Sequence, residues 1–173
     1  MLAFRCGSIE FVDKLFKTLL LPSLEYAAAV WDSCSKAESE SLEKLQLSVA
    51  RAVLSNSQKY IMKNKDLLQR LHWPTLSWRR RRVKLLLLWK VVNGQGPPSL
   101  RERLPQTSNT ARTTHCLRNS QSLAFLLCSS AQRLRSFLPS AIALWNSPPS
   151  SISSCTSASS FLNKLNCLMR LTS

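Results

Sequence analysis

Four consecutive arginines are the residues whose type and spacing best fit a chemical task. Arg79, Arg80, Arg81 and Arg82 follow a tryptophan and are followed closely by Lys84. A guanidinium group binds phosphate through two parallel hydrogen bonds and can stack on a base. Consecutive residues span a full helical turn, so two or three of these side chains can face a phosphate backbone while another packs inward. The run therefore predicts a contact with nucleic acid.

A neighbouring helix offers these arginines another role. They could be solvated, or could pair with carboxylates of the preceding predicted helix, namely Glu38, Glu40 and Glu43. Weaker candidates for phosphate contact precede the arginine run: Lys63 and Lys65, together with Lys59. Because surface lysines are common, the prediction of a nucleic-acid contact depends mainly on the arginines.

No set of residues has the spacing of a catalytic or metal site. Polymerase chemistry needs carboxylates that converge on two metal ions about 4 Å apart. The three aspartates, Asp13, Asp32 and Asp66, are isolated from one another and are predicted to be surface charges. The two histidines are far apart, the six cysteines include no C-x-x-C pair, and the three glycines form no phosphate-binding loop. We therefore expect no enzyme activity, no metal, no cofactor and no small-molecule substrate.

The charge of the chain is strongly positive. Lys and Arg number 24 against 9 acids, a formal net charge of +15 over 173 residues, and no acid follows Glu102. Such an excess favours a polyanionic partner, RNA or an RNA-DNA duplex. The most apolar run, 83–92, is too short for a membrane helix, which needs about 20 residues. We expect reduced cysteines and an intracellular location, nucleus or cytoplasm. A run of four arginines can act as a nuclear import signal.

Apolar periodicity predicts a succession of helices in the first 104 residues. A helix over 9–20 should kink or restart at Pro22, with a second piece over 24–31. Ser35 and Glu38 form a capping box for a helix that ends near residue 54. Its buried stripe is predicted to be Leu42, Leu45, Val49, Ala52 and Val53. A helix over 64–71 follows, and Thr75 caps the next one.

The helix after Thr75 is expected to end at Asn93-Gly94. Its second half is apolar on nearly all sides, so it must be buried on several of them. Four tryptophans are predicted to be core anchors: Trp31, Trp73, Trp89 and Trp145. Residues 105–122 form a polar linker in this interpretation.

The remaining segment, 123–173, is predicted to contain few regular elements. Residues 123–128 form a short strand or a turn of helix, 137–145 a helix, and Ser157 caps a last helix through 168. The predicted fold class is mainly α: a small helical bundle over 1–104, then a loop-rich α segment with at most one or two short strands.

Five short motifs occur in order along nearly the whole chain. Their residues are Pro22, Leu24, Tyr26, Ala27, Val30 and Trp31; Leu42, Glu43, Lys44 and Gln46; Pro74, Leu76, Arg79 and Arg80; Trp145, Asn146 and Pro149; and Phe161 and Leu165. In this order they resemble the carboxy-terminal region, the thumb and the segment after it, of reverse transcriptases from non-LTR (LINE-type) retrotransposons. Pro148 departs from the pattern, which usually has leucine there.

The resemblance implies a non-catalytic, thumb-like fragment of an RNA-directed DNA polymerase. The palm and its metal-binding aspartates would lie before Met1, and that upstream palm would be a partner. The thumb-like part would help to bind RNA or the template-primer duplex. Two alternatives stay open: a protein-interaction or structural module whose helix over 83–92 packs against a separate partner, and a decayed transposon copy without a selected function.

Overall fold

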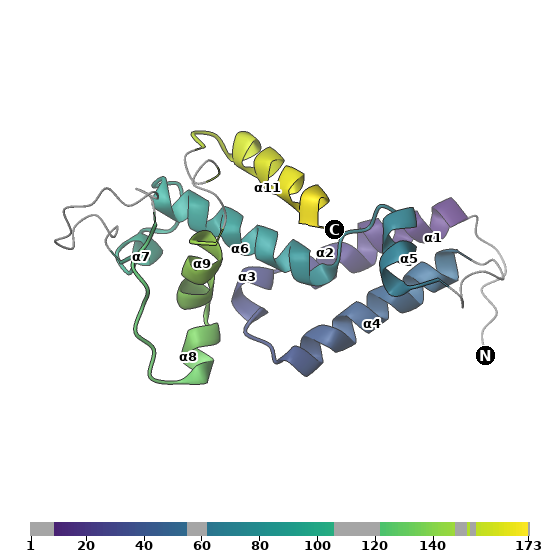
Figure 1. The fold of residues 1–173 in the computed structure, drawn as a ribbon, viewed down its shortest axis with the longest axis horizontal. Coiled ribbons are helices and arrows are strands. Elements are labelled where there is room, and N and C mark those ends of the chain that lie inside the picture. The colour runs from purple at the N-terminus through teal and green to yellow at the C-terminus, as the bar shows by residue number, and fades with distance from the viewer. Residues whose placement is uncertain (1–8, 55–61, 106–121, 148–151, 153–154, 173) are drawn as a thin grey trace. The chain divides into compact units, whose positions relative to one another are not determined.

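The computed structural model describes residues 9–54, 62–105, 122–147, 152 and 155–172 (Figure 1). The described part is mainly α, as predicted, and Leu123 is its only residue in a β-bridge. The helices, in chain order, are α1 Ile9–Leu15, a π-helical turn Phe16–Leu20, α2 Leu21–Glu25, α3 Ala28–Trp31, α4 Lys36–Val53, α5 Asn64–Arg70, α6 Leu76–Val92, α7 Pro98–Arg101, α8 Ala131–Arg135, α9 Phe137–Trp145 and α11 Ala158–Thr172. None of them is long and apolar enough to cross a membrane.

The chain divides into two compact units, and the division falls inside α6. The first unit comprises 1–28 and 34–80, and the second comprises 29–33 and 81–173. This division differs from the predicted boundary at residue 104. The physical reason is that the apolar second half of α6 belongs to the same core as the segment after residue 122. The predicted linker, 105–122, lies almost entirely outside the described residues.

Pro22 restarts the first helix, as predicted, but the second helical piece is shorter than expected. Proline has no N–H with which to continue the α-helical ladder. The chain adopts a π-helical turn before it, and α2 begins with Pro22 in its first turn. Ser23 donates a hydrogen bond to the Leu19 carbonyl at 3.0 Å. The predicted continuity over 24–31 is wrong, because Ala27 has a φ of 51° and separates α2 from α3.

The capping box of α4 is confirmed, whereas two residues of its predicted stripe are exposed. Ser35 N–H donates to Glu38 at 2.6 Å and Glu38 N–H to Ser35 Oγ at 3.3 Å. Leu45 is 46% exposed and Ala52 is also exposed, whereas Val53 is buried as predicted, together with Gln46 and Ala50, which the predicted stripe did not include. Gln46 is buried because its amide donates to the carbonyl oxygen of Pro74 at 3.0 Å.

The core of the first unit is built around Trp73. Its ring stacks on Phe16 with centroids 4.2 Å apart, among buried side chains from α4, α5 and α6. Its indole N–H donates to Asp13 at 2.9 Å, and Lys17 pairs with the other oxygen of that carboxylate at 2.8 Å. Asp13 is therefore not the surface charge that the sequence predicted, because it anchors the indole of a core residue.

Asp13 should contribute to stability in a pH-dependent way. The hydrogen bond from Lys17 does most to lower the pKa of Asp13, burial raises the pKa, and the hydrogen bond from Trp73 lowers it again, with a net lowering. A carboxyl whose folded pKa is depressed stabilises the fold above its unfolded pKa, about 4, and this stabilisation is lost as the pH falls through the folded pKa.

Asp13→Ala should therefore cost about 1–3 kcal/mol near neutral pH, because the buried Trp73 N–H loses its acceptor. Urea unfolding at pH about 7 and about 3 measures the effect, which should shrink at the lower pH. Asp13→Asn keeps an acceptor oxygen and should cost less. Lys17→Ala, at the exposed side of the pair, should cost at most about 0.5 kcal/mol. Equal losses for Asp13→Ala at both pH values would contradict this role.

The core of the second unit is built on the second half of α6. Leu88, Trp89 and Val91 have no exposed surface. Trp89 stacks against Phe161 with ring centroids 5.7 Å apart, and its indole N–H donates to the Cys155 carbonyl at 3.1 Å. The helix ends as predicted, since Gly94 has a left-handed φ of 75°. Gln95 N–H donates to the Lys90 carbonyl at 2.7 Å, which is the hydrogen bond of a Schellman C-cap with glycine.

The tryptophan predictions hold for three of the four residues. Trp73, Trp89 and Trp145 are at most 5% exposed, whereas Trp31 is only half-buried. Trp145 also stacks on Phe161, with centroids 6.0 Å apart. Residues of α9 and α11 therefore belong to the same core as the apolar part of α6. Both helices lie beside α6 in Figure 1.

Residues 122–128 form neither a regular strand nor a turn of helix. Leu123 is held instead by the side chain of Asn146, which accepts from the Leu123 N–H at 3.1 Å and donates to the Leu123 carbonyl at 2.8 Å. The predicted helix over 137–145 is confirmed, and Ser157 caps α11 by accepting from the Ser160 N–H at 3.2 Å. Helix α11 runs to Thr172, past the predicted end at 168.

Candidate nucleic-acid interface

Two residues cap the start of α6, the helix that carries the four arginines. Thr75 Oγ accepts from the Trp78 N–H at 3.3 Å, as the sequence predicted. The Glu43 carboxylate accepts from the N–H groups of Leu76 and Ser77 at 3.2 and 2.6 Å. Negative charge is favourable at a helix N-terminus, where backbone N–H groups lack partners. Glu43 is thus a helix cap and not a partner for the arginines.

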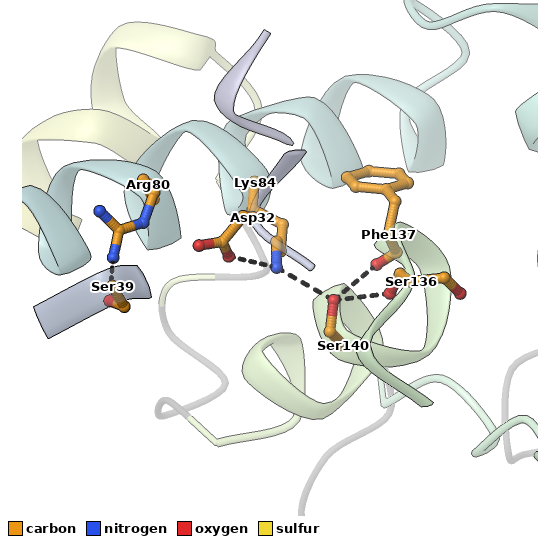
Figure 2. Close-up of polar contacts among 7 residues, drawn as sticks. All are labelled: Asp32, Ser39, Arg80, Lys84, Ser136, Phe137 and Ser140. Atoms are coloured by element: carbon orange, nitrogen blue, oxygen red, sulfur yellow. Dashed lines mark hydrogen bonds and ion pairs between the residues drawn. The ribbon is translucent and has the colours of Figure 1, made fainter. Parts of the chain in front are cut away.

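Arg79 and Arg80 are held by their own unit. Arg79 pairs with Glu25 at 2.7 Å, and its side chain is 19% exposed. Arg80 is 3% exposed and donates to Ser39 Oγ at 2.5 Å (Figure 2). Because a buried guanidinium cannot reach a phosphate backbone, the structure does not support Arg80 as a contact residue. These two arginines have partners that the sequence did not predict, Glu25 for Arg79 and Ser39 for Arg80.

Lys84 is buried as well and therefore cannot bind an external phosphate. It is 3% exposed, pairs with Asp32 at 2.5 Å and donates to Ser140 Oγ at 3.0 Å. The Ser140 hydroxyl in turn lies 2.7 Å from the Ser136 carbonyl oxygen and 3.1 Å from that of Phe137 (Figure 2). Asp32, whose side chain is 16% exposed, is likewise not a surface charge. These residues form a polar network inside the second unit.

Arg81 is the residue of the run that faces solvent. It is exposed, whereas Arg82 is half-buried and interacts within the chain. Arg81 lines an open cavity of about 450 Å³ in the second unit, and Arg135 of α8 lines the same cavity. Neither arginine has an ion pair or a side-chain hydrogen bond among the described residues. The structure thus brings a predicted contact residue together with an unpredicted one.

Sequence reasoning missed Arg135 because α8 was not predicted. The helix has five residues, too few for a periodic apolar pattern, and only its cap gives a signal: Ser130 accepts from the Arg133 N–H at 3.2 Å. Arg133 and Arg135 are both exposed. A serine just before a short arginine-containing segment was the available indication.

The electrostatics of the cavity favour an anion. Its one lining carboxylate, Asp32, is paired with Lys84, so the charges of Arg81 and Arg135 are left uncompensated at this surface. Two hydroxyl groups, Ser140 and Ser147, also line it, but both already donate to backbone carbonyls of α9 or its cap, so the arginines carry the attraction. By sequence, the second unit carries 12 Lys and Arg against 2 acids, net +10, whereas the first carries 12 against 7, net +5. Most of the excess positive charge thus belongs to the unit that holds the cavity.

Lys63 and Lys65 belong to the start of α5. Lys63 precedes α5 as its cap residue, Lys65 is in the first turn, and both are exposed. They belong to the first unit, whereas the cavity with Arg81 and Arg135 belongs to the second. Contact of Lys63 and Lys65 with nucleic acid stays a prediction, independent of the cavity.

Fold and site together define a basic, mainly helical protein with an arginine-lined cavity. No group of three or more His, Cys, Asp or Glu residues within the described ranges is placed to hold a metal ion. Compared with protein-family models, curated proteins and solved structures, the chain shows no significant match.

Proposed function

We propose that this chain is a non-catalytic nucleic-acid-binding fragment that corresponds to the thumb end of a LINE-type reverse transcriptase. It would bind RNA or template-primer duplex mainly through phosphate contacts, next to an upstream palm in the parent protein. The proposal places it inside the cell, in the nucleus or the cytoplasm. The arginine run is a weak import signal in this account, because two of its side chains are held by Glu25 and Ser39.

The observation that carries the proposal is the pair Arg81 and Arg135 at one cavity in a unit of net charge +10, which has 12 basic residues against 2 acidic ones. Two exposed guanidinium groups without a carboxylate partner are well suited to a phosphate backbone, which they can bind without losing an internal ion pair. The arginines that the sequence ranked equally with Arg81 would each have to break an internal contact first.

The alternative of a separate partner for residues 83–92 is favoured less in this proposal, because much of that helix already has a core of its own. Several apolar side chains of this helix, Leu85, Leu86, Leu88 and Trp89, pack in the core with Ile142, Trp145 and Phe161, whereas Val92 is 38% exposed. Those apolar side chains that the unit's own core covers need no second protein to bury them.

Replacing Arg81 and Arg135 together with alanine should weaken RNA binding about equally for all sequences. It should also reduce the slope of log affinity against log salt by about 0.7 for each lost phosphate contact on a single strand. Fluorescence anisotropy with a labelled RNA over a salt series measures both effects. The fold should stay intact, because both side chains are exposed.

The matched control removes two positive charges elsewhere. Lys36 and Lys44 are exposed on α4, so Lys36→Ala with Lys44→Ala lowers the net charge equally without touching the cavity. A Lys63→Ala and Lys65→Ala pair tests the other predicted surface in the same way. An unchanged salt slope in the Arg81 and Arg135 variant, or the same loss in the Lys36 and Lys44 control, would rule out this cavity as the contact site.

A further inference from the structure

We infer that the cavity beside Arg81 accepts an unpaired nucleotide, so that the protein prefers single-stranded nucleic acid to duplex. This inference rests on the proposed function and names its substrate class. It comes from the mixture of groups that line the cavity. Beside the two arginines there are four apolar residues, Leu134, Pro139, Ala143 and Leu144.

The apolar part of the lining distinguishes the two kinds of nucleic acid. A duplex presents phosphates and sugars outward and keeps the faces of its bases stacked inside, so it can use the arginines but not an apolar wall. An unpaired nucleotide offers a phosphate for Arg81 and Arg135 and a base face that gains from leaving water. Single-stranded RNA or DNA therefore matches both halves of the lining.

The wall that would meet the base is rigidly held. Pro139, Ser140, Ala143, Leu144 and Ser147 lie on one face of α9 and at its end. The other face carries Ala141, Ile142 and Trp145, which are at most 5% exposed in the core of the second unit. The hydrogen bond from Lys84 to Ser140 fixes the same wall from the side of α6. A site on a helix anchored in this way loses little entropy when a ligand binds.

The size of the cavity fits one nucleotide. Its volume of about 450 Å³ lies within the range of small-ligand sites, about 300–1,000 Å³. A base pair cannot enter with its partner strand attached, so any base that enters must be unpaired.

The test compares a labelled single-stranded RNA of about 12 uridines with an RNA hairpin duplex of similar charge, by anisotropy with the full chain. The single strand should bind at least about fivefold more tightly. Ala143→Phe should fill the cavity without altering its charge, because Ala143 lines the cavity and phenylalanine is uncharged. The fold should tolerate the larger side chain, because Ala143 is exposed. This variant should lose the preference for the single strand while keeping its affinity for the duplex. Arg81→Ala with Arg135→Ala should weaken the binding of both RNAs.

Two controls make each outcome decisive. Ala37→Phe adds the same bulk at an exposed position on α4 and should change neither affinity. Ser147→Leu fills the cavity from the end of α9 and replaces Ala143→Phe if that variant loses its helical circular dichroism. Equal affinities for both RNAs, unaffected by the filling variants, would overturn the single-strand preference and leave the proposed function standing. Binding of neither RNA would instead overturn the proposed function.

Discussion

Replacing Asp32 with alanine should lower the free energy of unfolding by about 3–5 kcal/mol. Lys84 is 3% exposed, and its ammonium is paired with Asp32 at 2.5 Å. Without the carboxylate, that charge is left in a low-dielectric surrounding with only the Ser140 hydroxyl as a hydrogen-bond acceptor in the network of Figure 2. Urea unfolding followed by circular dichroism measures the loss.

The double replacement Asp32→Leu with Lys84→Met is the informative control for this prediction. Removing both charges abolishes the ion pair with Lys84 and also the cost of burying it, so this variant should recover a large part of the loss caused by Asp32→Ala. The exposed pair Lys36 and Glu40, 3.9 Å apart, gives a reference for a bridge at the surface, worth at most about 1 kcal/mol. A loss for Asp32→Ala no larger than that of Lys36→Ala would contradict the buried network.

Trp89→Ala should destabilise the second unit by about 3–5 kcal/mol. Trp89 is 0% exposed, stacks against Phe161 and donates to the Cys155 carbonyl, so its removal leaves a cavity and an unpaired acceptor between α6 and the carboxy-terminal segment. Urea unfolding reports the stability, and near-ultraviolet circular dichroism reports the packing of the remaining aromatic residues.

Trp89→Phe separates the two contributions at this position. It keeps an aromatic ring against Phe161 and loses the hydrogen bond, so it should cost about 1–2 kcal/mol. If Trp89→Ala were no worse than Trp89→Phe, the carboxy-terminal segment would not share a core with α6, and the division of the chain near Arg80 would be wrong.

Sequence patterns were sufficient for the elements whose signals are local. The capping box at Ser35, the cap at Thr75 and the glycine end at Gly94 each depend on groups within a few residues. The apolar half of α6 was also correctly predicted to be buried on several sides. These features share one property, which is that no distant residue is needed to decide them.

The roles of the individual arginines could not be predicted from local sequence patterns. Arg79 meets a carboxylate 54 residues away, and Arg80 meets a hydroxyl 41 residues away. Only the tertiary fold shows that Arg81 is the exposed member, because four adjacent guanidinium groups look alike in sequence. The partner at the cavity, Arg135, lies on a helix too short to have a periodic signal.

Polar residues in the core explain the other differences. Gln46, and not Leu45, is buried in α4 because it lies on the same helix face as Ala50 and Val53, and its amide donates to the Pro74 carbonyl. The Asn146 side chain hydrogen-bonds the backbone N–H and carbonyl of Leu123. Periodicity alone could not decide between a strand and a helical turn for this segment. In both cases one side-chain amide satisfies backbone groups that would otherwise lack partners.

The salt dependence of RNA binding by the intact chain tests the central claim most directly. Single-stranded RNA titrated from about 50 to 200 mM salt should show log affinity falling linearly with log salt, because each neutralised phosphate releases counterions. Replacing Arg81 and Arg135 should flatten that line by about 1.4, at about 0.7 for each contact. Absence of binding at the lowest salt, or an affinity that salt does not change, would contradict the account of this protein as a phosphate-binding fragment.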